Sequence, residues 1–553
     1  MRGPYRLLAF LSIAPLLIAL DAAPAPAPTT PICHTEVKTD LPPPAKAILV
    51  GYGDGGFAVK TSSPEAQAYF DNGMQLAHAF AHKAAVSAFI RAEQLDPGCA
   101  MCVWGEAWSR GPTINYPIGT KVQADLAALA DKAAVFAANN PPKERALISA
   151  LQQRYHDGGG KGAGDDAFAR AMDRVAKDHP DDNEIAVVAA DAWLIPAAHR
   201  NGRDHLDRAR EILRTVLARA PNNTGAIHFY IHATEMDGVG VLALPYAEKL
   251  QALAPAASHL VHMPSHTYFW AGRYRLAEQS NLDAVRIDNA NAERLRPEGG
   301  VFGLGYHGHN VQFGEAAALI DGDAKGALSL AAVQVGQLPT MPPDKVFQQI
   351  GLGSAYFVYG RYGSAEAVAA LSDPGAKMPY AEAMWRYARG EAAARRGDVA
   401  AVKAEAAMIK AAPADLKKFG DFAPQARTIV DVARLVLVGR AAMLDKRWSD
   451  AEAAYRLAAS LQEAKLGDIT DPPGWWYPVR RSLAAALLAE AKPNAAAGEA
   501  RKALVRWAYD PMSLKILADS EAMTGQGADA QRELIFARAN WVGDLSATPL
   551  GLM

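Results

Sequence analysis

Hydrophobic residues make up 50% of the chain and lie in short groups between polar residues, with alanine in almost every group. Few stretches alternate β-branched or aromatic residues with polar ones, which is the pattern of a half-buried strand. Small side chains such as alanine allow neighbouring helices to pack closely. The pattern therefore predicts an all-α protein.

The segment from Ala66 to Asp96 predicts how these helices pair. Small or apolar residues stand where two helices of a hairpin would cross, and a proline stands where the second helix would end. Counted from Ala66 as position 1, they are Gly73 at 8, Ala85 at 20, Phe89 at 24, Ala92 at 27 and Pro97 at 32. This is the frame of the tetratricopeptide (TPR) repeat, whose period is 34 residues.

The same frame recurs along the chain. It is found from Thr224 to Pro255, at Gly272-Arg273-Tyr274 with Ala277, at Gly360-Arg361-Tyr362 with Ala365, and at Lys446-Arg447-Trp448 with Ala451. We expect one TPR-like α-solenoid over residues 46–553, with insertions at 110–145, 156–166 and 290–305.

The N-terminal residues have the pattern of a targeting segment. Residues 1–6 carry positive charge, Leu7 to Leu20 form an apolar run, and small residues follow around Ala23. These features predict a cleaved signal peptide over residues 1–23, followed by an Ala/Pro-rich spacer over residues 24–45. We expect an exported protein, periplasmic or secreted, with no membrane span after cleavage.

The overall charge gives no reason to expect a nucleic acid or an anionic membrane as partner. Lys+Arg number 57 and Asp+Glu number 59, so the formal charge is −2. The expected partners are a small-molecule substrate or a protein or peptide in the groove of the solenoid.

Histidines are concentrated in one part of the chain. Seven of the fourteen lie between His228 and His309, where uniform scatter would place about two. His228 and His232 are four residues apart, as are His262 and His266, so each pair shares one helix face. The two pairs are 34 residues apart (262 − 228), which is one repeat.

The repeat frame places these residues on the concave face. In a TPR repeat, positions 2, 5, 9, 12 and 13 of the first helix line the groove. The two pairs occupy positions 5 and 9 of consecutive repeats, Glu235 is at 12 of the first, and His259 is at 2 of the second. We predict a His-lined concave groove whose metal ligands are His228, His232, His262, His266 and His309.

Imidazole ligands suit copper or zinc, and iron is a further candidate. Glu235 is expected to act as a catalytic base, a ligand or a hydrogen-bond partner of a ligand. Other groove residues are candidates for ligand binding, although packing is an alternative for the tryptophans. They are Trp104, Trp108, His78, His82, Asn115 and Tyr268.

Cys99 and Cys102 form the spacing Cys-x-x-Cys, with Cys33 the third cysteine of the chain. In an oxidising compartment the pair can form a disulfide. Two thiolates on a metal and two inert buried thiols are the alternatives, and one such pair alone is a weak zinc signal.

Several stretches resemble a group of exported bacterial TPR proteins. They are Cys99 to Glu106 (CAMCVWGE), His228 to Glu235 (HFYIHATE), His262 to His266 (HMPSH), His309-Asn310 and Trp475 to Pro478. The resemblance spans most of the chain after residue 45 and implies a repeat solenoid and an exported location, but no particular reaction. It also argues against His307 as a ligand.

Two functions remain open. One is a metalloenzyme that oxidises or hydrolyses a small organic substrate. The chain has no Gly-x-Ser-x-Gly elbow, no phosphate-binding glycine loop and no His-Glu-x-x-His motif, so metal chemistry is the enzymatic reading that remains. The other is a non-catalytic scaffold that binds a partner or a metal ion.

Overall fold

The computed structural model describes residues 41–156, 163–200, 202–409 and 416–552, and within these ranges every regular element is a helix. The expected signal peptide and most of the spacer lie outside the described residues. No helix in the described ranges is both long enough and apolar enough to cross a membrane. The expectation of an all-α, TPR-like solenoid is confirmed.

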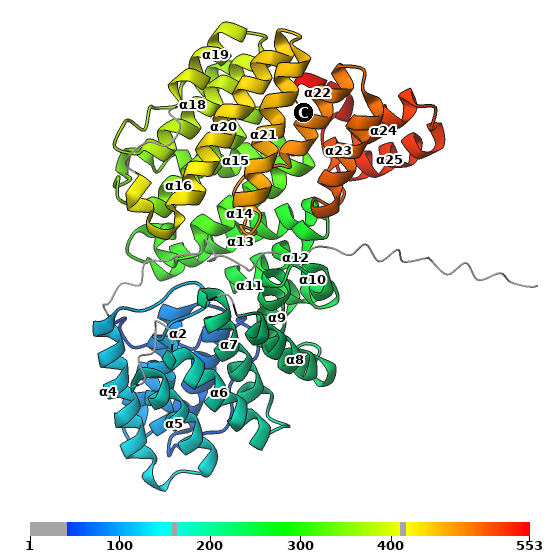
Figure 1. Cartoon of the computed structure of the whole chain (residues 1–553). Coiled ribbons are helices and arrows are strands. Elements are labelled where there is room, and N and C mark those ends of the chain that lie inside the picture. The colour runs from blue at the N-terminus through cyan, green and yellow to red at the C-terminus, as the bar shows by residue number, and fades with distance from the viewer. Residues whose placement is uncertain (1–40, 157–162, 201, 410–415, 553) are drawn as a thin grey trace, which may run out of the picture.

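The helices follow one another as an array of antiparallel neighbours (Figure 1). The first half consists of α1 (Pro64–His78), α2 (His82–Leu95), α3 (Ala100–Ser109), α4 (Thr120–Phe136), α5 (Pro142–His156), α6 (Ala163–Asp178), α7 (Asn183–Arg200), α8 (Arg203–Arg219), α9 (Thr224–Met236), α10 (Leu244–Leu253), α11 (Ser258–His262) and α12 (Pro264–Trp270). The second half consists of α13 (Tyr274–Leu295), α14 (His307–Asp321), α15 (Ala324–Val335), α16 (Val346–Tyr362), α17 (Ala365–Ala369), α18 (Pro379–Arg395), α19 (Val399–Met408), α20 (Ala423–Leu444), α21 (Trp448–Leu466), α22 (Val479–Ala489), α23 (Pro493–Arg506), α24 (Pro511–Met523) and α25 (Gly527–Ala539).

The first hairpin shows why the repeat frame needs small residues. A Cβ atom on Gly73 of α1 would lie 2.6 Å from the ring of Phe89 in α2, and one on Gly105 of α3 would lie 2.3 Å from it. The ring of Phe89 is therefore enclosed between two glycines, and it is fully buried. Glycine at both positions lets three consecutive helices pack around one large side chain.

The array differs from the sequence expectation at residues 110–145. We expected an insertion there, but α4 and the start of α5 fill much of this range and continue the array. Leu126, Ala130 and Ala133 bury one side of α4, so the segment has the apolar stripe of a packed helix despite lacking the TPR frame.

Two hydrophobic cores meet in the middle of the chain. The first core contains buried residues from Tyr52 to Met263, together with Tyr306, and the second contains buried residues from Tyr268 to Leu545. In Figure 1 the helices α9 to α14 lie between the N-terminal and C-terminal parts of the array. The border between the cores falls between α11 and α12, inside the His-Met-Pro-Ser-His stretch.

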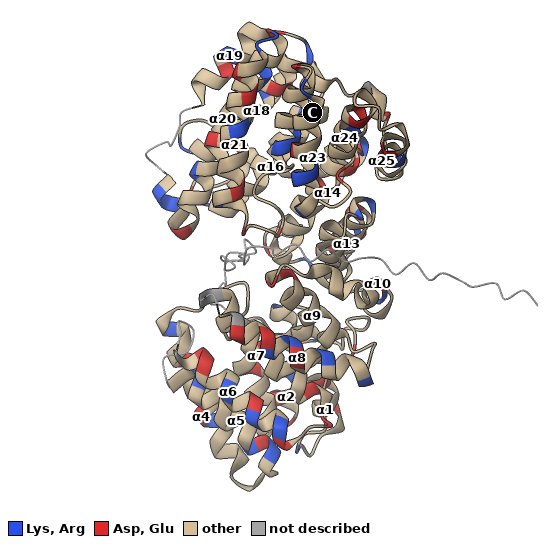
Figure 2. Cartoon of the chain, turned by 45° about the vertical axis from the view of Figure 1, so that its right-hand side comes forward, with Lys and Arg blue, Asp and Glu red and all other residues tan. Residues whose placement is uncertain are grey.

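Charged residues of both signs are interspersed over both parts of the molecule (Figure 2). This distribution agrees with the near-zero net charge of the sequence. We see no strongly basic face on the described residues in this view.

Candidate metal centre

Three histidines converge in what we call set A: His228 and His232 of α9 with His259 of α11. The Nε2 atom of His228 lies 3.1 Å from Nε2 of His259 and 3.1 Å from Nε2 of His232. All three residues are at most 5% exposed. The helical spacing brings the first two together, and packing of α11 beside α9 adds the third.

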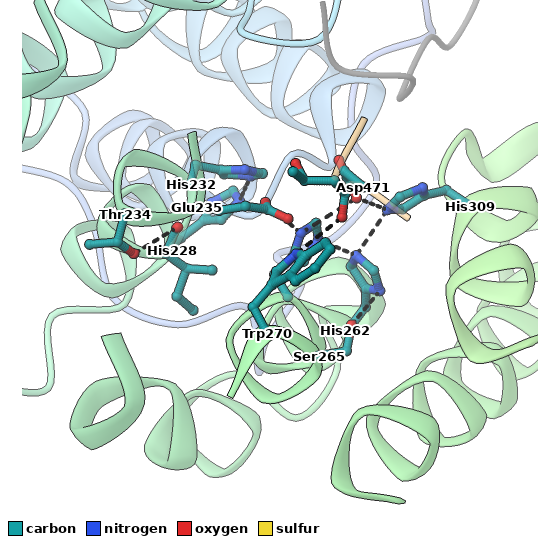
Figure 3. Close-up of polar contacts among 12 residues, drawn as sticks. His228, His232, Thr234, Glu235, His262, Ser265, Trp270, His309 and Asp471 are labelled. Atoms are coloured by element: carbon teal, nitrogen blue, oxygen red, sulfur yellow. Dashed lines mark hydrogen bonds and ion pairs between the residues drawn. The ribbon is translucent and has the colours of Figure 1, made fainter. Parts of the chain in front are cut away.

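A second trio, set B, repeats this plan: His262 and His266 with His309 of α14. The Nε2 atom of His262 lies 2.8 Å from Nε2 of His266 and 3.1 Å from Nε2 of His309. Met263 separates α11 from α12, which begins at Pro264, so the two histidines of this pair lie on either side of a helix break. Figure 3 labels His228 and His232 of set A beside His262 and His309 of set B.

Hydrogen bonds at Nδ1, the ring nitrogen that faces away from the set, fix the orientation of several imidazole rings. His228 donates from Nδ1 to the backbone carbonyl of His78 at 2.6 Å. His262 donates from Nδ1 to Oδ1 of Asn281 at 2.6 Å, and the Asn281 amide itself donates to the carbonyl of Ala277, which fixes its orientation. The Nε2 atoms of His228 and His262 therefore present lone pairs to their sets.

Burial keeps most of these imidazoles neutral. It lowers the pKa of His228 to about 3, from a usual value of 6.5. It also lowers the pKa values of three others well below the usual value: His232, His259 and His262. A neutral imidazole is the form that binds a metal ion, so these residues are in the binding form at pH 7.

His266 differs because carboxylates surround its Nδ1 atom. Glu235 Oε2 lies 2.7 Å from this atom and Asp471 Oδ1 lies 3.4 Å from it. Burial would lower the pKa of His266, but the two carboxylates outweigh it and raise the pKa to about 9. The pKa of Glu235 is raised by burial. Without a cation, His266 carries the positive charge of the site.

Asp471 reaches the site from the loop between α21 and α22. Its Oδ1 atom lies 3.2 Å from Nε2 of His309 (Figure 3). Burial would raise the pKa of Asp471, but His266 and His309 hold it well below its usual range. Trp270 of α12 donates from Nε1 to the carbonyl of Thr470 at 3.2 Å, which ties this loop to the helix that carries His266.

Each set lies against one phenylalanine. The ring of Phe80 is 4.5, 5.8 and 5.1 Å from the rings of His228, His232 and His259, centroid to centroid. The ring of Phe313 is 5.4, 4.8 and 5.9 Å from the rings of His262, His266 and His309. Phe80 has a positive φ of 53°, an uncommon conformation for such a residue. The two rings exclude water from one side of each set.

The predicted groove residues of the first repeats surround set A rather than join it. His78 contributes its backbone carbonyl, while its side chain contacts Glu184, with Nε2 3.1 Å from Oε2. Trp104 and Trp108 stack on each other at 5.5 Å, and the Trp108 ring meets the His78 ring edge-on at 5.8 Å. Trp104 also donates from Nε1 to the carbonyl of Leu147, as a packed core residue does.

His82 and Asn115 contact residues that pack on set A. The His82 ring packs on the Phe80 ring at 5.1 Å, and burial lowers its pKa to about 4. Asn115 donates to the hydroxyl of Tyr306 at 2.9 Å, and the Tyr306 ring packs on His259 at 4.4 Å. Asn115 therefore reaches set A only through Tyr306.

Tyr268 has a different environment. It is buried, and the charged groups that affect its hydroxyl are Glu248 and Arg273, neither of which belongs to a histidine set. His307 is also separate, since its Nδ1 atom contacts Asp288 Oδ2 at 3.1 Å.

Cys99 and Cys102 form a disulfide at the start of α3. Of the three alternatives for the pair, the structure contains the disulfide, not two metal-bound thiolates or two free thiols. Both residues are buried in the first core and take no part in the histidine sets.

Two residues of the site were absent from the predicted set of ligands. His259 has a sequence signal, because position 2 of the second repeat faces the groove. Asp471 has none, since its loop lies far along the chain and follows no repeat position. The groups among the described residues that can hold a metal ion are set A, set B, and Glu235 with His266 and Asp471.

The distances within the sets suit a metal ion. Nitrogen ligands at about 2.0–2.1 Å from a tetrahedral zinc or copper ion lie roughly 3.3 Å from one another. The Nε2 separations of 2.8–3.1 Å are close to this value. Burial keeps competing water away, so three imidazole nitrogens that face one another favour a cation between them.

The fold and these sets define the class of protein: an all-α helical-repeat protein with two buried three-histidine clusters.

No protein-family model matches the chain, and no curated protein matches it. A solved structure of the human IFIT1 dimer with m7Gppp-AAAA is similar at 14% identity and a TM-score of 0.33, covering 81% of this chain and 90% of that one. The TPR domain of P58(IPK) is similar at 14% identity and a TM-score of 0.21, covering 63% and 91%. The APC/C hetero-tetramer Cut9-Hcn1 is similar at 13% identity and a TM-score of 0.22, covering 88% and 95%. Similarities at these scores carry no argument about function.

Proposed function

We propose that this protein binds transition metal ions, copper or zinc, at the border between its two cores. One observation carries the proposal: in each of two buried sets, three imidazole Nε2 atoms converge within hydrogen-bonding distance. Neighbouring lone pairs repel one another, and a bound cation replaces that repulsion with three coordinate bonds.

The surroundings of the sets support metal binding over a role in packing alone. A buried histidine that only packs needs one or two hydrogen-bond partners and no neighbouring histidines. Here the Nδ1 atoms of His228, His262 and His266 contact a carbonyl, an amide and a carboxylate. Such contacts orient metal-bound imidazoles in proteins, and their loss typically costs about 10–100-fold in metal affinity.

Elemental analysis tests the proposal directly. The full chain is expressed for export in a bacterial host, purified without an affinity His-tag and analysed for copper, zinc and iron. We expect stoichiometric metal, and we expect His232→Ala and His266→Ala to lower it while far-UV circular dichroism stays unchanged. His156→Ala, a change at an exposed histidine, serves as the matched control. A protein that holds no metal, and takes none up on reconstitution, would refute the proposal.

A catalytic role is a second candidate, favoured by the position of Asp471. The Oδ1 atom of Asp471 lies 3.2 Å from Nε2 of His309 in set B. Asp471 itself belongs to neither three-histidine set. A carboxylate so placed can accept a hydrogen bond from a substrate or water and orient it during metal-assisted oxidation or hydrolysis of a small organic substrate. Asp471→Asn tests this candidate in the metal-loaded protein: turnover of a phenol or ester panel should fall while metal content is kept. An inactive wild-type protein would leave metal binding without catalysis.

A further inference from the structure

The geometry points to a pair of copper ions, one in set A and one in set B, as the cargo of this site. This inference rests on the proposed function and extends it to the number and identity of the ions. The two sets use the same plan: two histidines four residues apart and a third from a following helix. Each set is complete by itself, so neither needs a ligand from the other.

The sets are close enough for their ions to interact. The ring of His232 in set A lies 5.7 Å from the ring of His266 in set B, centroid to centroid. The rings of His259 and His262 are 5.6 Å apart. One helix, α11, supplies a histidine to each set, His259 to set A and His262 to set B. Two ions held by these rings therefore face each other within one buried site.

The number and kind of the ligands favour copper in its +1 state. Each set offers three imidazole nitrogens. Three nitrogen ligands suit the three-coordinate geometry of Cu(I), whereas Zn(II) usually takes four ligands. The two buried carboxylates beside the site, Glu235 and Asp471, contact His266 and His309 from outside the two sets.

The first experiment counts the ions. Metal-free full-length protein is loaded anaerobically with excess Cu(I), desalted and analysed for copper. We expect two copper ions per chain, and one in each of two single-site variants, His259→Gln in set A and His309→Gln in set B. His205→Gln, which changes a partly exposed histidine that contacts Asp166, keeps two. Circular dichroism checks folding, and His232→Gln replaces a variant that does not fold.

Each result distinguishes the inference from the proposed function. No copper in the wild type, with no zinc taken up in a parallel loading, would overturn both, whereas zinc without copper would overturn the copper pair alone. A single copper per chain, or two in both site variants, would overturn the pair and leave metal binding in place. If loading with equal amounts of Cu(I) and Zn(II) under anaerobic conditions filled the site with zinc, the choice of copper would be wrong.

The second experiment tests whether the ions are close. The loaded protein is oxidised with ferricyanide, and the Cu(II) spectrum is recorded by electron paramagnetic resonance. The spins of two neighbouring Cu(II) ions interact through space, so the wild-type spectrum should be broadened and should contain a half-field transition. The spectra of His259→Gln and His309→Gln should show neither feature. A wild-type spectrum of two isolated Cu(II) ions would overturn the pair.

Discussion

The imidazole rings of the two sets owe their orientation to groups on their far side. Asn281 is the clearest example, because it is fully buried and its amide is held by the carbonyl of Ala277. It accepts the Nδ1–H of His262, so Nε2 of that ring must face set B. A ligand that is already aligned loses little entropy when an ion binds.

Replacing Asn281 should therefore weaken metal binding at set B. We expect Asn281→Ala to reduce the affinity by about 10–100-fold, as measured by competition with a chelator. Asn291→Ala is the matched control, since Asn291 lies on the same helix and its side chain hydrogen-bonds the carbonyl of Ala256 and Arg294 rather than a histidine. Equal affinity in both variants would show that the hydrogen bond does not orient His262.

Glu315 of α14 is a buried carboxyl whose charge affects stability. Burial raises its pKa well above the usual 4.5, so the folded protein holds a proton that the unfolded chain releases. Its contribution to stability is present below about pH 4.5 and is lost as the pH rises toward the folded pKa. Glu315→Gln removes the ionisation. The melting temperature of this variant relative to wild type should rise steadily between pH 5 and pH 9.

Glu293→Gln, the same change at an exposed carboxyl, serves as the control for that series. A difference from wild type that stayed constant with pH for Glu315→Gln would mean that the folded protein holds this carboxyl ionised.

At the scale of helices, the crossing of α1, α2 and α3 depends on space for one ring. Alanine at position 73 would place a Cβ atom 2.6 Å from the ring of Phe89, closer than atoms can approach. We expect Gly73→Ala to lower the free energy of unfolding by about 1–3 kcal/mol. Gly498→Ala, in the interior of α23 with no atom within 4 Å of the added Cβ, should raise it by about 0.5–1 kcal/mol. Chemical denaturation measures both, and equal effects would show that the ring moves aside.

The sequence predicts the elements better than it predicts the site. The spacing of Gly73 and Phe89, and the 34-residue offset between the His-x-x-x-His pairs, follow from helix geometry, so they can be read without a structure. Asp471 cannot, because loop contacts between distant repeats leave no periodic signal. The depth of the site was also missed: the groove histidines are buried, since Tyr306 and the loop of Asp471 cover them. The roles of the predicted residues as metal ligands stay predictions.

At the scale of the whole molecule, the metal centre lies where two hydrophobic cores meet. Set A is carried by helices of the first core, while His266 and His309 belong to helices beside the second. His262 ends the last helix of the first core and serves set B, so an ion in set B would join the two halves of the array. A ligand that binds only the folded state stabilises it by about 4 kcal/mol at a thousand times its Kd.

Removing the metal should therefore destabilise the border between the cores more than either core. We expect calorimetry of the loaded protein to show one unfolding transition, and chelation to lower its midpoint and divide it into two. The double variant His232→Gln/His266→Gln should unfold like the chelated wild type, with or without added copper. If chelation left the wild-type transition unchanged, the two cores would be held together by helix packing alone, and the ions would contribute nothing to the fold.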